Sequence, residues 1–96
     1  MFTWLNKGGV KSDEGYAFQS MHRFYFHYTE GDRRMQINVE PCFDKQDKFS
    51  LALYTNSLTS WLPPHDQEPL SPDRVEQIKR RISAALKFMN IEHEFE

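Results

Sequence analysis

Apolar and polar residues alternate along two neighbouring segments, Arg23–Tyr28 and Arg34–Glu40, which are separated by Thr-Glu-Gly-Asp-Arg. Strict alternation of this kind predicts half-buried β-strands. Gly31 and Asp32 suit the two central positions of a type I′ or II′ hairpin turn, which fixes the register of the two strands. The apolar pairs then share one face: Tyr28 with Met35, Phe26 with Ile37 and Phe24 with Val39. The opposite face is mainly polar: Arg23, Tyr25, His27, Thr29, Arg34, Gln36, Asn38 and Glu40.

Shorter runs predict further strands around this hairpin. Phe2–Leu5 is a candidate short strand in a lead-in segment that is rich in turn residues. Tyr16–Ser20 alternates with Tyr16 and Phe18 inward. A three-residue loop, Ser20-Met21-His22, would set Phe18 opposite Phe24 and Tyr16 opposite Phe26.

A fourth main strand is predicted at Phe49–Tyr54, after a polar loop with the sequence PCFDKQDK. Its alternation places two sets of side chains on opposite faces. The inward set is Phe49, Leu51 and Leu53, and the outward set is Ser50, Ala52 and Tyr54. The terminal segment IEHEFE, Ile91–Glu96, also alternates and predicts a short last strand with His93 inward and hydrogen-bonded.

Between these strands, Ser71–Met89 has the signals of one amphipathic helix. Ser71 is a suitable N-cap, Pro72 follows at the first helical position, and Asn90 suits a left-handed residue after the last turn. The apolar residues recur at helical spacing and form one stripe: Val75, Ile78, Ile82, Ala85, Leu86 and Met89.

These elements predict an α+β fold in two layers, with a four- to five-stranded antiparallel sheet and one C-terminal helix packed on one face. A single helix covers one face of a sheet only, so the polar face of the hairpin should remain in water. With 96 residues, the chain is expected to form a single α+β domain over residues 1–96. Aromatic residues make up 15% of the chain, which is enough to build one core.

Charge and targeting signals narrow the class of protein. The formal net charge is −2, which gives no support for binding to nucleic acid or to a membrane surface. The N-terminal segment lacks a signal-peptide apolar region, and no window resembles a membrane span. The one cysteine, Cys42, cannot form an internal disulfide. We therefore expect a cytoplasmic protein.

The residues that could carry catalysis do not form a recognisable pattern. The loop SWLPPHDQEPL, residues 60–70, contains His65 and Asp66, but adjacent side chains do not normally make a catalytic pair. Its prolines and Trp61 favour a connector that closes one end of the core. The histidines lack metal-ligand spacing, and Cys42 has no base nearby in sequence, so no metal, cofactor or nucleophile is expected.

Two surfaces remain as candidates for protein binding. Tyrosine and arginine are enriched at the centres of interfaces, and the polar sheet face carries both. The predicted partner-binding residues are Arg23, Tyr25, His27, Arg34, Gln36, Asn38, Tyr54 and Trp61. An acidic run, Glu92, Glu94 and Glu96, could attract a basic partner or protect the edge of the sheet from aggregation.

Several stretches also resemble a known family. These are GGVKSDEGYAFQ, RFYFHYTEGDRRMQINVE, the later W-x-x-P at Trp61–Pro64, and the ending ISAALKFMNIEHEFE. Together they resemble the immunity protein 74 family of bacterial polymorphic toxin systems, over most of the chain. The resemblance implies a small cytosolic protein, encoded beside a toxin, that binds the toxin and blocks it. It transfers no binding residue to a numbered position.

The leading interpretation is a non-enzymatic immunity protein that neutralises a cognate protein toxin by steric occlusion. The alternative is a small interaction module, including a homodimer formed through the polar sheet face or a sheet edge. An enzyme is a third interpretation, and it would need a compact pocket that gathers His27, His65 or Cys42 with a carboxylate.

Overall fold

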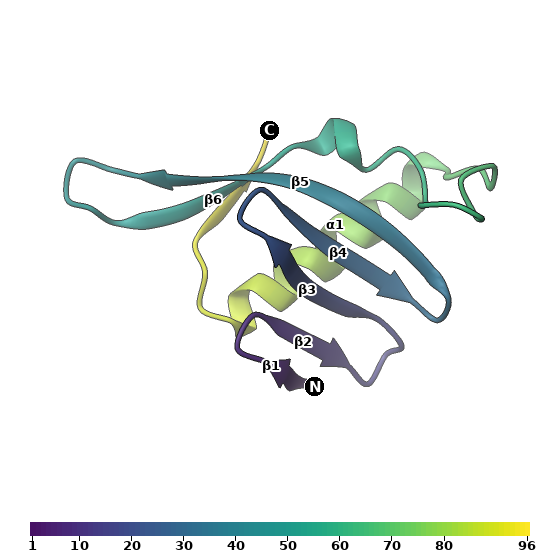
Figure 1. Ribbon diagram of the computed structural model, residues 1–96, viewed down its shortest axis with the longest axis horizontal. Coiled ribbons are helices and arrows are strands. Elements are labelled where there is room, and N and C mark those ends of the chain that lie inside the picture. Colours follow the sequence, from purple (N-terminus) through teal and green to yellow (C-terminus); the bar gives the residue numbers. More distant parts are fainter.

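A computed structural model describes residues 1–96 and contains one seven-stranded sheet with one long helix behind it (Figure 1). The strands lie side by side in chain order, from β1 at one edge to β7 at the other. The elements are β1 (Phe2–Asn6), β2 (Gly9–Ser12), β3 (Ala17–His22), β4 (Tyr25–Glu30), β5 (Arg33–Phe43), β6 (Phe49–Leu53), the 3-10 turn η1 (Thr55–Ser57), α1 (Pro72–Phe88) and β7 (His93–Phe95).

The α+β class and the single covering helix are confirmed, but the predicted number of four to five strands is wrong. β2 lies in the lead-in segment, where Val10 and Ser12 are buried and Lys11 is exposed. A four-residue strand next to Gly8 and Gly9 has too few alternating positions to be distinguished from a turn by its pattern alone. The sheet is also not wholly antiparallel, because β7 pairs with β6 in the parallel direction after the helical crossover.

The register predicted for the β4–β5 hairpin is confirmed. Phe26 lies opposite Ile37, Tyr28 opposite Met35 and His27 opposite Gln36. Gly31 has a φ of 58°, whereas Asp32 has none of this left-handed character, which is the pattern of a type II′ turn.

The predicted register between β3 and β4 is wrong. Phe18 lies opposite Tyr28 and Ser20 opposite Phe26, and a register irregularity precedes His22. The chain reverses two residues later than expected, so Phe24 lies in the turn with an exposed fraction of 50% instead of pointing inward. The shift is an even number of residues, so Phe18 keeps its inward direction and stacks on Phe26 at a ring distance of 4.7 Å.

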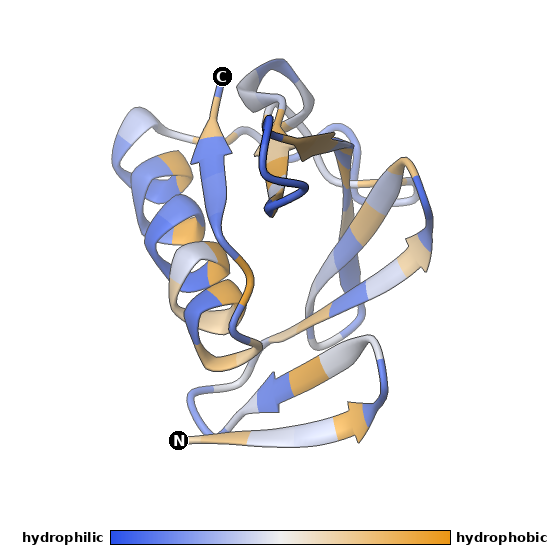
Figure 2. Ribbon diagram, turned by 90° about the vertical axis from the view of Figure 1, so that its left-hand side faces the viewer, coloured by the Kyte–Doolittle hydropathy of each residue, from blue (hydrophilic) through white to orange (hydrophobic).

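The helix and its ends are as predicted. Ser71 accepts a hydrogen bond from the Arg74 amide, and Asn90 follows the last turn with a φ of 61°. Its apolar residues face the strands (Figure 2), and Ile78, Ile82, Ala85 and Leu86 are buried. They pack with the inward residues of the strands in one core cluster that also contains Val10, Tyr16, Phe18, Val39, Leu51 and Leu53.

The strands β5 and β6 extend beyond the rest of the sheet as a projecting hairpin, here called the arm (residues 40–51; Figure 1). Pro41, Cys42 and Phe43 belong to β5 and pair with β6, so their assignment to a polar loop is wrong. Phe49 was predicted inward and has the correct direction by alternation, but 40% of its surface is exposed. Ala52 was predicted outward and is buried, and it lies between the longer side chains of Glu40 and Glu94 on the two neighbouring strands.

Candidate partner-binding surface

Five of the predicted partner-binding residues lie together on the face of β4 and β5 that points away from α1. Tyr25 is paired with Asn38 and His27 with Gln36, and Arg34, opposite Thr29, is the next residue of β5 on the same face. No second layer covers this face, which we call the outer sheet face and define by Tyr25, His27, Arg34, Gln36 and Asn38.

Aromatic rings form a row along the outer sheet face. The Tyr25 ring lies 5.7 Å from His27, and on its other side His22 stacks on it at 5.3 Å with an interplanar angle of 14°. Burial and, to a smaller extent, the charge of Arg34 lower the pKa of His27 below its usual value of 6.5, so its imidazole is neutral at pH 7. The row therefore places a neutral imidazole beside the cation of Arg34.

The other end of this side of the sheet is acidic. Glu40 on β5 and Glu94 on β7 lie on either side of Ala52, in one row across three strands. Tyr54, another predicted residue, follows β6 and donates its hydroxyl to Glu40. This hydrogen bond raises the pKa of Tyr54 to about 12, so the phenol stays protonated. The charge along this side therefore changes sign between Arg34 and the glutamates.

Arg23 lies in the turn between β3 and β4, at the border of the outer sheet face. Its guanidinium lies over the ring of Phe24 at 5.1 Å from the centroid. It is exposed and has no carboxylate within ion-pair distance. An exposed, unpaired arginine held against an aromatic ring is available for a partner's carboxylate.

Trp61, the last predicted residue, is a core residue with an exposed fraction of 4%. Its ring lies 6.3 Å from Tyr28, and the guanidinium of Arg74 lies 5.9 Å above it. The loop around it is tied to β5 by the Leu62 amide, which donates to the Arg34 carbonyl at 2.6 Å. The expected role of Trp61 in closing the end of the core is confirmed, and its contact with a partner stays a prediction.

A second exposed surface was not predicted from the sequence. A groove of about 320 Å³ opens between the arm and the β3–β4 turn. Its walls are mainly apolar, and Phe43 and Phe49 form a cross-strand pair on the arm at a ring distance of 5.6 Å. The remaining wall includes His22 and Arg23 of the turn and Ile91 after the helix. We call this surface the aromatic groove.

The aromatic groove exists because the helix is shorter than the sheet that it covers. Seventeen helical residues span about 25 Å, whereas the longest dimension of the molecule is 43 Å. The inward side chains of the arm therefore continue the core pattern beyond the reach of α1, and Phe43 has an exposed fraction of 67%. Alternation in PCF and FSLAL could have indicated this surface, had the first of these segments been assigned to a strand.

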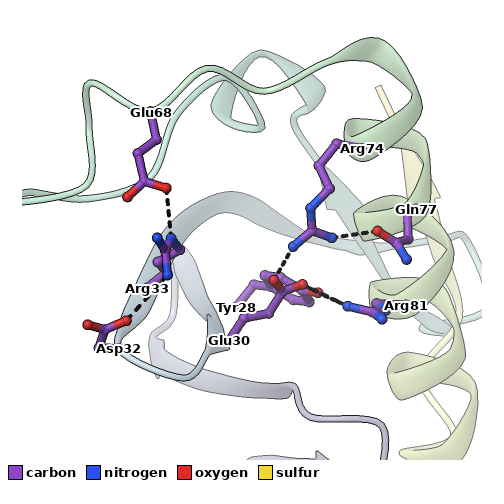
Figure 3. Close-up of polar contacts among 8 residues, drawn as sticks. All are labelled: Tyr28, Glu30, Asp32, Arg33, Glu68, Arg74, Gln77 and Arg81. Atoms are coloured by element: carbon purple, nitrogen blue, oxygen red, sulfur yellow. Dashed lines mark hydrogen bonds and ion pairs between the residues drawn. The ribbon is translucent and has the colours of Figure 1, made fainter.

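Ion pairs near the start of α1 form a separate cluster that joins structural elements (Figure 3). Glu30 receives hydrogen bonds from the Tyr28 hydroxyl, Arg74 and Arg81, and Arg74 also donates to Gln77 at 2.6 Å. Arg33 pairs with Glu68 of the proline-rich loop at 2.8 Å. An adjoining hollow of about 580 Å³ has four charged residues in its lining, and they are already paired, Glu30 with Arg74 and Arg33 with Glu68.

The side chains that an enzyme would need lie in three different parts of the fold. His27 is on the outer sheet face, and Cys42 is exposed on the arm with its thiol 3.6 Å from the Glu40 carbonyl. His65 lies 3.7 Å from Asp32 and 4.0 Å from Glu68, in the loop before α1. No group of three or more His, Cys, Asp or Glu side chains is arranged to hold a metal ion. His93 is partly buried and hydrogen-bonded to Ser83 at 2.7 Å, as predicted.

Comparisons with known proteins identify the family to which the chain belongs. The immunity protein 74 family matches residues 19–96, which include every strand from β4 onward and the whole helix. The chain therefore belongs to the immunity protein 74 family. No curated protein and no solved structure matches it. Nor does its single long helix have the length and apolar character needed to cross a bilayer.

Proposed function

We propose that this chain is an immunity protein that binds a cognate bacterial toxin in the cytoplasm and neutralises it by covering a surface that the toxin needs. Membership of the immunity protein 74 family, over residues 19–96, is the observation that carries this proposal. The chain acts by binding and catalyses no reaction of its own.

The outer sheet face has the properties that such binding requires. It is a broad, uncovered surface on a sheet, and its stacked aromatic row loses little conformational freedom when a partner covers it. Arg34 at one end and Glu40 with Glu94 at the other give it a charge pattern that orients an approaching partner. Rigid presentation of such a surface suits steric occlusion, since the immunity protein does not need to change shape.

Co-expression tests the function directly. The toxin domain encoded beside the gene of this chain should stop growth when expressed alone, and co-expression of this chain should restore growth. The purified pair, with the toxin inactivated by substitution, should form a stable complex. Continued killing in the presence of well-expressed immunity protein would remove the proposal, and a concentration-independent dimer with no affinity for the toxin would favour the homodimer module.

The outer sheet face is tested by two substitutions and a matched control. Tyr25→Ala and Arg34→Ala should each weaken toxin binding at least tenfold. Arg80→Ala removes an exposed arginine from the far side of α1 and should bind as the unaltered chain does. Equal affinities for all four proteins would move the contact to another surface while leaving neutralisation intact.

A further inference from the structure

Every titratable side chain that lines the aromatic groove is a cation or a hydrogen-bond donor. Arg23 has no ion-pair partner, and no carboxylate lines the groove although the chain has 14 acidic residues. The Nδ1 atom of His22 accepts a hydrogen bond from the Phe24 amide at 3.3 Å, so the neutral ring carries its proton on Nε2 and presents a donor. The rim is therefore complementary to a hydrogen-bond acceptor on the partner. A carboxylate suits it best, because a carboxylate also forms an ion pair with Arg23.

The floor and far wall of the groove are complementary to an apolar side chain of the partner. Phe43 and Phe49 are exposed, and Pro41 and Ile91 extend the apolar lining between them and the core. A cavity of about 150 Å³ accepts benzene, so 320 Å³ admits one or two side chains of a partner protein. Burial of an aromatic or aliphatic side chain here would remove apolar surface from water on both molecules.

The arm favours side-chain docking over strand addition. The Val39 amide donates to the Phe24 carbonyl, so the amide and carbonyl of Val39 point toward β4. Every second residue of β5 directs its backbone groups to this same edge. Two residues further on, Pro41 presents the same edge and has no amide hydrogen to donate. An incoming β-strand would lose a ladder bond at the centre of the free edge, whereas an inserted side chain needs none.

We propose that the aromatic groove is the anchor site for the toxin, which inserts an apolar side chain between the arm and the β3–β4 turn and pairs a neighbouring carboxylate with Arg23. This inference rests on the proposed function and adds the chemistry of the contact. The groove opens on the α1 side of the sheet, and His22 lines it and also stacks on Tyr25, so the groove and the outer sheet face meet at the β3–β4 turn.

Binding of the inactivated toxin domain from the neighbouring gene tests the anchor. Phe43→Ser and Arg23→Glu should each weaken binding roughly 30-fold or more, the size of effect typical of a hot-spot side chain. Leu5→Ser and Arg80→Glu are the matched controls, since they make an apolar-to-serine and an arginine-to-glutamate change at exposed positions away from the groove. Circular dichroism establishes that each variant is folded, and Phe49→Ser gives a second measurement of the apolar wall.

Charge exchange tests the predicted carboxylate. Exposed acidic residues of the toxin are changed to arginine one at a time, and one such change should restore binding of the Arg23→Glu variant. Failure of every exchange would overturn the Arg23 pairing. Full affinity of the groove variants for a toxin that the unaltered chain binds tightly would overturn the anchor but leave the proposed function standing, whereas absence of binding by the unaltered chain would remove the proposed function itself.

A second copy of this chain is the competing occupant, because the exposed apolar walls of two aromatic grooves could be buried against each other. Light scattering of the unaltered chain and of Phe43→Ser decides this point. A monomer in both cases supports the proposal, and a dimer that the substitution dissociates overturns it.

Discussion

Arg81 of α1 and Glu30 at the end of β4 form an ion pair, with Nη1 of the arginine 2.7 Å from Oε1 of the carboxylate. The carboxylate also receives the Tyr28 hydroxyl and the guanidinium of Arg74, so one acidic group joins the helix to the hairpin (Figure 3). Only 16% of the Glu30 side chain is exposed. Removal of its carboxylate would therefore leave several hydrogen-bond donors unpaired in a partly buried place.

Glu30→Ala should lower the free energy of unfolding by about 2 kcal/mol, since two guanidinium groups and a phenol lose their common acceptor in a partly buried place. Urea unfolding monitored by tryptophan fluorescence measures the change. Glu76→Ala removes the partner of Lys79 from an exposed pair on the same helix and should change stability by less than about 0.5 kcal/mol. Equal effects of the two substitutions would contradict the joining role of Glu30.

The Glu30 carboxylate also makes the stability of the fold depend on pH. Burial would raise the pKa of Glu30, but hydrogen bonds from Tyr28 and Arg74 and the charges of both arginines outweigh it and hold the pKa below the usual 4.5. The stability that this ionised group contributes is thus fully present above pH 4.5 and is lost as the pH falls through the lower value of the folded protein.

Glu30→Gln removes this titration and leaves all other acidic groups in place. The difference in unfolding free energy between the unaltered chain and this variant should be largest at neutral pH and should shrink on acidification below the pKa of the unfolded chain. Urea titrations at a series of pH values measure it. A difference that stays constant down to about pH 3 would show that Glu30 is not the titrating group.

The left-handed conformation of Asn90 predicts that one substitution at this position retains or raises the stability of the protein. It has a φ of 61° immediately after α1, and the Ile91 amide closes the helix end by donating to the Leu86 carbonyl at 2.9 Å. Asn90→Gly should therefore retain or raise stability by up to about 1 kcal/mol, whereas Asn90→Ala should lower it by about 1 kcal/mol. Thermal unfolding of the two variants checks the order, which would be reversed if the helix continued through this position.

The position of Pro41 at the free edge of the arm predicts that its substitution changes the self-association of the chain. Pro41→Val supplies an amide hydrogen at the free edge of the arm and should increase self-association through edge pairing, because a β-branched residue also favours a strand. Sedimentation velocity over a range of concentrations measures the effect. Ser50→Val serves as the control, since Ser50 lies on the neighbouring strand opposite Cys42. A variant at position 41 that stays monomeric would show that other features protect this edge.

Local patterns in the sequence determined the elements with clear periodicity and clear end signals. The β4–β5 hairpin follows from Gly31 and from alternation on both sides of it, and α1 follows from the Ser71 cap, the apolar stripe and Asn90. These features are decided by the conformations and faces that neighbouring residues impose on one another, so they can be predicted without knowledge of distant contacts. The same holds for the polar character of the outer sheet face.

Tertiary structure alone decided how far each strand extends and which surfaces stay uncovered. Phe24 and Phe49 have the alternation of core residues, yet one lies in a turn and the other lies beyond the end of the helix. The direction of β7 and the aromatic groove likewise depend on where a helix of limited length crosses the sheet. Hydrophobic pattern specifies the face on which a side chain lies, but burial also requires another element to be present opposite that face, and this is a property of the whole fold.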